Sequence, residues 1–245
     1  AHVVSALVLT LKEKPPQRCD LSLLTPDRLP GATGRIEDIE IGATRRSLRI
    51  GDVFGVRAGD LDDIRVEGAS ERFDNLGAGM SRGTISVAGD LGQLAGRGMS
   101  GGVIRVSGGV GRLAGSGMSG GRLEIGGDAG DLVGGPLPGE MRGMTGGIVN
   151  IRGNAGERAG DRMRRGLVAI GGRAGDATAS RMIGGTLVCF GPAGPRPGYL
   201  MRRGTLVLGG AAALTPTFVD SGVHELVALR LLARWLLDEN IEGGA

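Results

Sequence analysis

Short runs of alternating apolar and polar residues, separated by glycines, recur at a fixed interval through the middle of the chain. Methionine marks this interval at seven positions, Met80, Met99, Met118, Met144, Met163, Met182 and Met201. Successive markers are 19 residues apart, except that 26 residues separate Met118 from Met144. The seven additional residues fall near Gly135-Pro136-Leu137-Pro138-Gly139 and predict a loop inserted into an otherwise regular repeat.

The residues that follow each marker keep the same pattern in every copy. Glycine stands three and nine residues after the marker, as at Gly83 and Gly89, and apolar residues stand five and seven residues after it, as at Ile85 and Val87. Alternation with period two, bounded by glycines, is typical of a short half-buried strand between turns. Each repeat therefore predicts a strand, and nothing in this part of the chain has helical spacing.

A unit of this length cannot bury its apolar side alone, but stacked units can, each hydrogen-bonded to the next at about 4.8 Å. We therefore predict an all-β fold, a right-handed parallel β-helix with repeats of about 19 residues. A left-handed hexapeptide helix would need an inward aliphatic residue every six residues. A calcium-binding roll would need a period of nine with Asp in each repeat. Neither pattern is present.

The composition changes at both ends of the repeat array. Residues 1–35 predict a strand over Val3–Leu11 followed by a Pro-rich docking loop. Residues 36–212 predict the β-helix. Its first coils, over Ile36–Gly68, keep the strand-then-glycine pattern without the methionine, at Ile39/Ile41-Gly42, Leu48/Ile50-Gly51 and Ile64/Val66-Gly68.

Residues 213–245 predict a C-terminal helix. We expect it to begin at Ser221, with Ser221 as the N-cap and Glu225 in the first turn. The helix contains the only Trp of the chain, Trp235, and a series of leucines. Because the last coil of a solenoid exposes an unpaired edge, the helix is predicted to cap that coil, and docking on a partner is the alternative.

Composition narrows the classes of function. The chain has 50 Gly but only six aromatic residues, which agrees with a narrow coil that has little room for rings. Its two cysteines, Cys19 and Cys189, cannot form a disulfide scaffold, and no Cys/His cluster suggests a structural metal. No apolar run is long enough to span a membrane, and the first residues do not resemble a signal peptide. We expect a cytoplasmic protein with no membrane partner.

Catalytic and nucleotide-binding motifs are weak. Gly96–Gly101 and Gly115–Gly120 match G-x-G-x-x-G, but they recur with the repeat and precede strands, so they are interpreted as turn glycines. The only histidines, His2 and His224, lie at opposite ends of the chain, which argues against a Ser–His–Asp or Cys–His site. We therefore predict no catalytic residue and no metal site on this chain.

Two further groups of residues could carry chemistry. Cys189 stands in an apolar strand column, so it is interpreted as a buried core residue. Asp60, Asp62 and Asp63 form the densest acidic cluster. They could bind a divalent cation, as in a β-helix polysaccharide lyase, but a solvated turn is the preferred interpretation, and the shortage of aromatic residues argues against sugar binding.

Arginines suggest a ligand. Between Pro138 and Thr205 there are 11 Arg against four acidic residues. Six of these arginines lie within two residues of a methionine marker, namely Arg162, Arg164, Arg165, Arg181, Arg202 and Arg203. Stacked coils would bring them to one edge, where their guanidinium groups suit carboxylates and phosphates. A polyanion is one interpretation of this edge. Solvation, or pairing with acidic residues of a neighbouring subunit, is the other. Without stacking aromatics, we do not expect nucleic acid.

The repeated unit Gly-x-Gly-Met-Ser-Gly-Gly, followed by a short apolar strand and a further Gly, resembles the C-terminal β-helix of glutamate synthase. It is more similar to the C-type subunit of formylmethanofuran dehydrogenase and to the bacterial counterpart of that subunit in the formyltransferase/hydrolase complex. The resemblance covers roughly Leu7 to Gly210 and includes the Leu21–Asp27 loop, and the helix after the repeats resembles the family as well. Of the 29 basic residues only Lys12 and Lys14 are lysines. This bias suggests a GC-rich bacterium and favours the hydrolase complex.

The resemblance implies a scaffold subunit with no active site of its own. Its partners would be an amidohydrolase-like subunit and a formyltransferase subunit in a hetero-oligomer. The complex would move a formyl group from formyl-tetrahydromethanopterin to a methanofuran-type carrier (methylofuran) and hydrolyse it to formate, with no cofactor on this chain. The carrier bears a polyglutamate tail, which we expect to dock on the arginine edge. A subunit of a molybdenum or tungsten dehydrogenase and a glutamate-synthase-like structural module are the alternatives.

Overall fold

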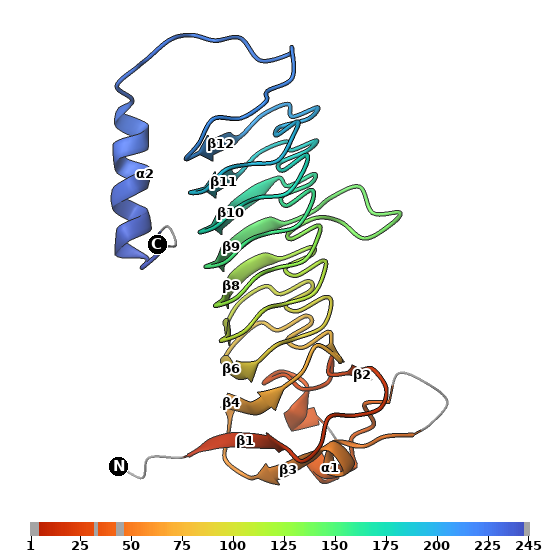
Figure 1. The fold of residues 1–245 in the computed structure, drawn as a ribbon. Coiled ribbons are helices and arrows are strands. Elements are labelled where there is room, and N and C mark those ends of the chain that lie inside the picture. The colour runs from red at the N-terminus through yellow and green to blue at the C-terminus, as the bar shows by residue number, and fades with distance from the viewer. Residues whose placement is uncertain (1–4, 32–33, 43–46, 243–245) are drawn as a thin grey trace.

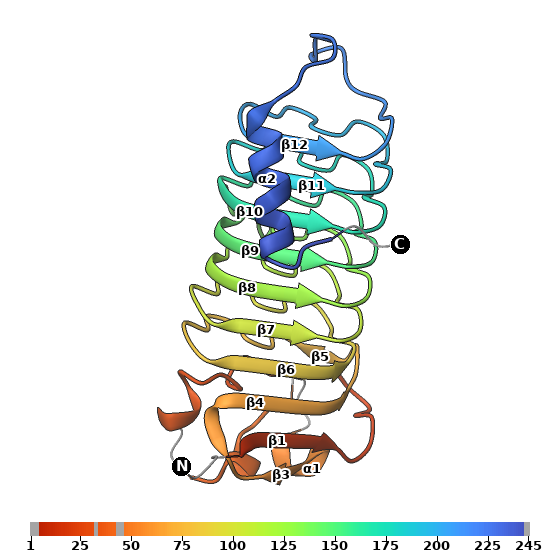
Figure 2. The same ribbon diagram turned by 90° about the vertical axis from the view of Figure 1, so that its left-hand side faces the viewer.

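A computed structural model describes residues 5–31, 34–42 and 47–242 and shows the repeats stacked into one elongated β-helix (Figure 1). In Figure 2 the strands of the front face run from left to right while successive coils rise from bottom to top. Since the chain returns behind this face, the helix is right-handed. The fold predicted from the 19-residue repeat is confirmed.

One ten-stranded sheet forms the front face, in the order β12-β11-β10-β9-β8-β7-β6-β4-β1-β3, where β1 is Ala6–Leu11 and β3 is Phe54–Arg57. The coils contribute β4 (Asp60–Ala69), β6 (Thr84–Gly89), β7 (Val103–Val106), β8 (Ser119–Ile125), β9 (Thr145–Ile151), β10 (Arg165–Ile170), β11 (Thr186–Cys189) and β12 (Thr205–Leu208). Neighbouring strands of the coils pair in parallel, and their register follows the repeat. Ile104 lies beside Ile85 and Leu123, and Leu123 lies beside Val149 across the longer step.

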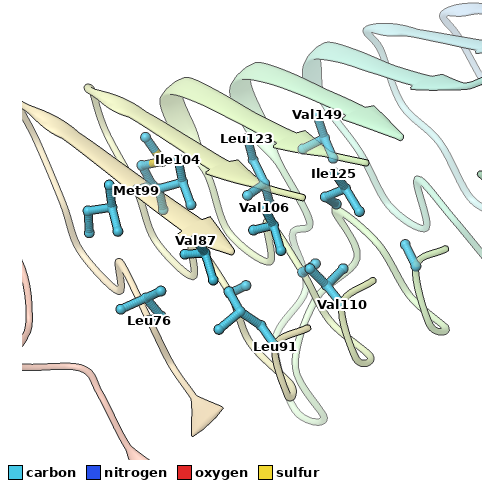
Figure 3. Close-up of a cluster of buried hydrophobic side chains, with 14 of the residues drawn as sticks. Leu76, Val87, Leu91, Met99, Ile104, Val106, Val110, Leu123, Ile125 and Val149 are labelled. Carbon is cyan, nitrogen blue, oxygen red and sulfur yellow. The ribbon is translucent and has the colours of Figure 1, made fainter. Parts of the chain in front are cut away.

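The inward columns form a continuous core. Six of the seven methionine markers, from Met80 to Met182, are fully buried, and Met201 in the last coil is partly buried. Strand residues five and seven positions after the markers are buried along most of the array, and Figure 3 shows how Ile104, Val106, Leu123 and Ile125 stack between coils. Burying an aliphatic side chain of this size contributes about 1.5–3 kcal/mol. Stacking therefore supplies the core that a single coil lacks.

Glycine is required where the chain turns into each strand. Gly102 has a φ of +76°, and a Cβ on it would lie 2.8 Å from the carbonyl oxygen of Gly83 in the coil before. A side chain would therefore meet both a backbone strain and a steric clash. The loop predicted between Met118 and Met144 also forms, and it projects from the β-helix on the side away from the sheet (Figure 1).

The chain before β4 differs from the sequence prediction. Ile36–Asp38 forms a short 3-10 helix, η2, and Ile50–Val53 forms the helix α1, so the apolar pairs at 39–41 and 48–50 are not coil strands. The next strand, β3 (Phe54–Arg57), runs antiparallel to β1 (Ala6–Leu11), which itself pairs in parallel with β4. These segments cover the open strand edge of the first coil. A further parallel coil would pair with that edge but would itself end in an open edge.

The Pro-rich segment packs on the chain's own first coils. Its strand β2 (Cys19–Asp20) pairs with β5 (Phe73–Asp74), and η1 (Leu29–Gly31) follows. Leu21, Leu24 and Leu29 are buried, and the carboxylate of Asp27 accepts hydrogen bonds from the backbone N–H and the hydroxyl of Ser81 (2.7 and 2.6 Å). Docking of this segment on another chain stays a prediction.

The C-terminal helix α2 (Val227–Asp238) begins six residues after the predicted start, and Ser221 does not cap it. Gly222 has a φ of +84°, which is incompatible with a helix beginning at Ser221. The helix does not lie across the open end of the last coil. It runs along the outer face of the sheet (Figure 2), where Leu236 and Ile241 pack on Leu167, Ala169 and Val188. In the described part of the chain, no helix is long and apolar enough to cross a membrane.

Candidate anion-binding edge

The structure divides the six predicted arginines into two groups. Arg162 and Arg181 lie directly before Met163 and Met182, in a turn where both adopt a left-handed φ of 52°. Earlier coils have glycine at the same position, at Gly79, Gly98 and Gly117. The left-handed conformation costs a residue with a side chain about 1–2 kcal/mol. These two arginines occupy a position where the backbone favours glycine, and Leu200 in the last coil adopts the same left-handed conformation there (φ 55°).

A buried carboxylate holds this turn together. Asp161 is 1% exposed, and its carboxylate accepts a hydrogen bond from Nη2 of Arg158 (2.8 Å) and another from the hydroxyl of Ser180. Nε of Arg162 and Nη1 of Arg181 lie 4.0 and 3.9 Å from the same carboxylate. Three cations thus share one anion. The turn keeps a positive charge and already accommodates one carboxylate.

The inserted loop is attached to the same turn. Nη1 of Arg162 donates a hydrogen bond to the backbone carbonyl oxygen of Glu140 (3.0 Å). The carboxylate of Glu140 lies 3.5 Å from Nη2 of Arg97 and accepts a hydrogen bond from the backbone N–H of Leu137. The loop is therefore fixed beside the Asp161 turn by arginines from two different coils.

The second group follows the methionine markers. Arg164 and Arg202 occupy equivalent positions two coils apart, with Ile183 between them, and Arg165 and Arg203 are separated in the same way by Gly184. Two coils correspond to about 10 Å. The structure therefore does not bring the six arginines into one unbroken row.

This second group has no acidic partner. Arg165, Arg202 and Arg203 are exposed and form no ion pair within the described part of the chain, and Nε of Arg164 is buried without a hydrogen-bond partner. Some arginines nearer the N-terminus do have an acidic partner, since Arg82 pairs with Asp62 (2.5 Å) and Arg105 with Glu124 (3.0 Å). Four unpaired guanidinium groups near one end of the solenoid are chemically suited to an external anion.

Sequence reasoning missed Arg158, Asp161 and Ser180. Their positions in the repeat hold unrelated residues in other coils, so no column marks them. A local signal existed, because Arg158 and Arg162 flank Asp161 at spacings that allow ion pairs, and Ser180 follows Asp161 by one repeat of 19 residues.

The acidic cluster is dispersed. Asp60 accepts a hydrogen bond from the backbone N–H of Asp62, Asp62 pairs with Arg82, and Asp63 pairs with Arg65 (3.1 Å). Within the described residues, no group of three or more His, Cys, Asp or Glu side chains could hold a metal ion. The three carboxylates have three separate partners and lie at the start of the strand β4, so the turn predicted for them is wrong.

Both cysteines are buried and free. Burial raises the pKa of the Cys189 thiol and of the Cys19 thiol, and the nearby carboxylate of Asp74 raises the pKa of Cys19 further. A raised thiol pKa leaves little thiolate near neutral pH, and the thiolate is the nucleophile. Cys189 is thus a core residue, as its place in the strand column predicts.

The chain was compared with protein-family models, solved structures and curated sequences. No protein-family model matches the chain. An X-ray structure of the formyltransferase/hydrolase complex FhcABCD from Methylorubrum extorquens, in complex with methylofuran, contains a chain that is 44% identical to this one. That chain superposes with a TM-score of 0.91, and the match covers 96% of this chain and 88% of that one.

A curated sequence gives the kind of subunit. The C-type subunit of the formyltransferase/hydrolase complex Fhc of Methylorubrum extorquens is 45% identical over 86 residues. This match spans 35% of the present chain and about a third (32%) of the relative. The near full-length structural match and the stretch shared with the curated subunit lead to the same assignment. The chain belongs to the family of the C-type subunit of the formyltransferase/hydrolase complex.

Proposed function

We propose that the chain is a scaffold subunit of a one-carbon transfer complex and has no active site of its own. The complex would transfer a formyl group from formyl-tetrahydromethanopterin to a methanofuran-type carrier and hydrolyse it to formate. The observation that carries this proposal is the 96% coverage of the chain by a 44% identical chain of a formyltransferase/hydrolase complex. A β-helix filled by aliphatic and methionine side chains suits such a role, because it presents long, rigid faces to its neighbours.

The proposed partners are an amidohydrolase-like subunit and a formyltransferase subunit, and the proposed location is the cytoplasm. The two enzyme names in the matched complex, formyltransferase and hydrolase, support partners of these two kinds. If so, the isolated chain neither transfers nor hydrolyses formyl groups.

The arginine edge is proposed to hold the polyglutamate tail of the carrier. The matched complex contains methylofuran, and two features of the present chain support a site for carboxylates. The Asp161 turn already binds a carboxylate with arginines of two coils. Arg165, Arg202 and Arg203 lack an acidic partner in the described part of the chain. A flexible polycarboxylate could neutralise arginines of both groups.

Charge reversal tests this role. The complex is produced with all its subunits, and this chain carries Arg202→Glu and Arg203→Glu together. We expect the purified complex to lose most of its bound carrier, and salt to release the carrier from the unmodified complex, because surface electrostatics are screened. The matched control reverses Arg57 and Arg112, which are exposed and unpaired among the described residues but lie outside the edge. Carrier content that is unchanged in the first variant would contradict the proposal.

A further inference from the structure

Exposed apolar side chains are concentrated at one end of the molecule. Of the 14 large hydrophobic residues that are exposed within the described ranges, 12 lie between Tyr199 and Leu237. Patches of this kind mark protein interaction sites on soluble proteins. The helix α2 lies at the centre of this region, so a binding surface is expected beside it.

The position of α2 is fixed by its C-terminal half. Leu236 is the only buried residue of the helix, and Leu232 packs beside it on the sheet. Glu239, directly after the helix, forms an ion pair with Nη1 of Arg122 (2.5 Å), and Nη2 of Arg122 donates to the Glu239 carbonyl oxygen (2.6 Å). These contacts hold the helix α2 in one position on the outer face of the sheet, where its side forms one wall of a groove.

A groove of about 300 Å³ runs along this wall. Its floor consists of Gly147, Ile148, Gly166, Leu167 and Thr186 from three neighbouring coils, and its wall consists of Leu232 and Trp235. Gly147 and Gly166 contribute backbone to this floor, since a Cβ on either would lie against the preceding coil and not in the groove. The volume is at the small end of the range of about 300–1,000 Å³ for ligand pockets. It suits one large apolar side chain with its backbone.

An arginine, Arg165, lies next to the floor of this groove in the sequence. Arg165 directly precedes Gly166 at the beginning of β10, is exposed, and has no acidic partner within the described residues. The surface therefore offers an apolar groove with an arginine at its border. The complementary segment carries a large apolar side chain beside a carboxylate.

We propose that this groove binds such a segment from another subunit of the complex. The inference rests on the proposed function, since it requires that the chain is assembled with other polypeptides. A second copy is the less suitable occupant. The chain has segments of this type itself. Glu140 followed by Met141 (71% exposed) lies in the inserted loop on the opposite side of the solenoid (Figure 1), and Val219 (89% exposed) precedes Asp220 in the segment after the last coil. Copies joined through either segment would make a head-to-tail contact between different surfaces, whereas most soluble homo-oligomers close through identical surfaces.

The test fills the groove and leaves every arginine unchanged. Thr186→Trp places an indole on the floor, whereas Thr205→Trp places the same side chain at the paired position of the next coil, outside the groove. Each variant is produced together with the other subunits, and its incorporation is measured by native mass spectrometry. We expect Thr186→Trp to reduce incorporation at least tenfold and Thr205→Trp to leave it unchanged, with the same circular dichroism melting temperature for both isolated chains. Equal incorporation of Thr186→Trp, Thr205→Trp and the unmodified chain would overturn the inference.

A photo-crosslinking variant identifies the occupant directly and does not depend on a loss of binding. With p-benzoylphenylalanine in place of Thr186, the expected product is a peptide of another subunit in which an apolar residue stands next to Asp or Glu. A crosslink to a second copy of this chain, or no crosslink in the assembled complex, would refute the inference. An unmodified chain that does not enter the complex would instead contradict the proposed function, and the inference with it.

Discussion

Asp161 is the residue on which the arginine turn depends most directly. Asp161→Asn keeps the size of the side chain but leaves Arg158, Arg162 and Arg181 without a counter-ion. Removing one partner of a buried ion pair costs about 3–5 kcal/mol. The arginine side chains are 28–40% exposed, so solvent screening reduces the expected loss to about 2 kcal/mol. Urea unfolding measures it.

Ser180→Ala is the control for this substitution, because it removes one hydrogen bond to Asp161 and no charge. It should cost about 1 kcal/mol. An Asp161→Asn variant as stable as the unmodified protein would show that the carboxylate does not hold the turn.

Two glycines separate backbone strain from steric clash. Gly98 has a φ of +64° with no atom within 4 Å of an added Cβ, whereas a Cβ on Gly102 would lie 2.7 Å from Cε of Met80 and 2.8 Å from the carbonyl oxygen of Gly83. We expect Gly98→Ala to lower the free energy of unfolding by about 1 kcal/mol, the cost of the left-handed backbone alone. Gly102→Ala should cost more in the same urea titration. Equal costs would refute the steric role of the Gly102 column.

The buried thiol of Cys189 predicts a dependence on alkaline pH. Burial raises its pKa above the ordinary value of 9.0, so the unfolded chain ionises first as the pH rises. Ionisation of the unfolded state favours unfolding, and stability should therefore fall from about pH 9 upward. Cys189→Ala should remove part of this fall, as measured by urea midpoints between about pH 8 and pH 10. An identical pH profile for both proteins would contradict the prediction.

Periodicity decides which residues could be predicted from the sequence. The buried positions of Met99, Ile104 and Val106 follow from columns that repeat in seven coils. The Asp161 cluster could not be derived in this way, because its members occur in one coil pair only. Contacts between coils at non-repeating positions depend on side-chain geometry, which the column pattern does not contain.

At the scale of elements, α2 is predicted to detach without unfolding the solenoid. Leu236→Asp places a charge in its small interface with Leu167 and Val188. Because Trp235 is the only Trp of the chain and is 38% exposed in the structure, its fluorescence should shift to longer wavelength. The far-ultraviolet β signal should persist. Leu231→Asp, on the exposed side of the helix (64% exposed), should leave the fluorescence unchanged. Loss of the β signal in Leu236→Asp would show that the helix is part of the folding core.

The sequence predicts the existence of α2 but not its place. A terminal helix at the end of a solenoid is expected to cap it, and the structure places the helix on the sheet instead. The outward positions of the strands contain the missed signal. They are polar in the early coils, as at Ser86, Arg105 and Glu124, and apolar in the later ones, as at Ala169 and Val188. Because an exposed apolar stripe on the sheet is unfavourable in water, the change from polar to apolar outward residues predicts that another element covers the later coils.

At the scale of the whole molecule, each end of the β-helix is closed differently. The strands β1 and β3 and the helix α1 cover the first coil, whereas residues 209–226 cross over the last coil and Phe218 packs against Gly198 (Figure 1). The arginine groups, the groove beside α2 and most exposed apolar residues lie toward this second end. The N-terminal end of the solenoid is therefore covered by the chain itself, and the proposed binding surfaces lie toward the C-terminal end.

The central claim is that this chain works as part of a complex. It is tested most directly by native mass spectrometry of the endogenous protein after gentle purification at low salt. We predict a hetero-oligomer that contains an amidohydrolase-like subunit and a formyltransferase subunit, with additional mass spaced by glutamyl units from the carrier. A lone monomer, under conditions that preserve other complexes, would contradict the account. Molybdenum or tungsten subunits with iron–sulfur clusters would contradict the hydrolytic complex and identify a dehydrogenase.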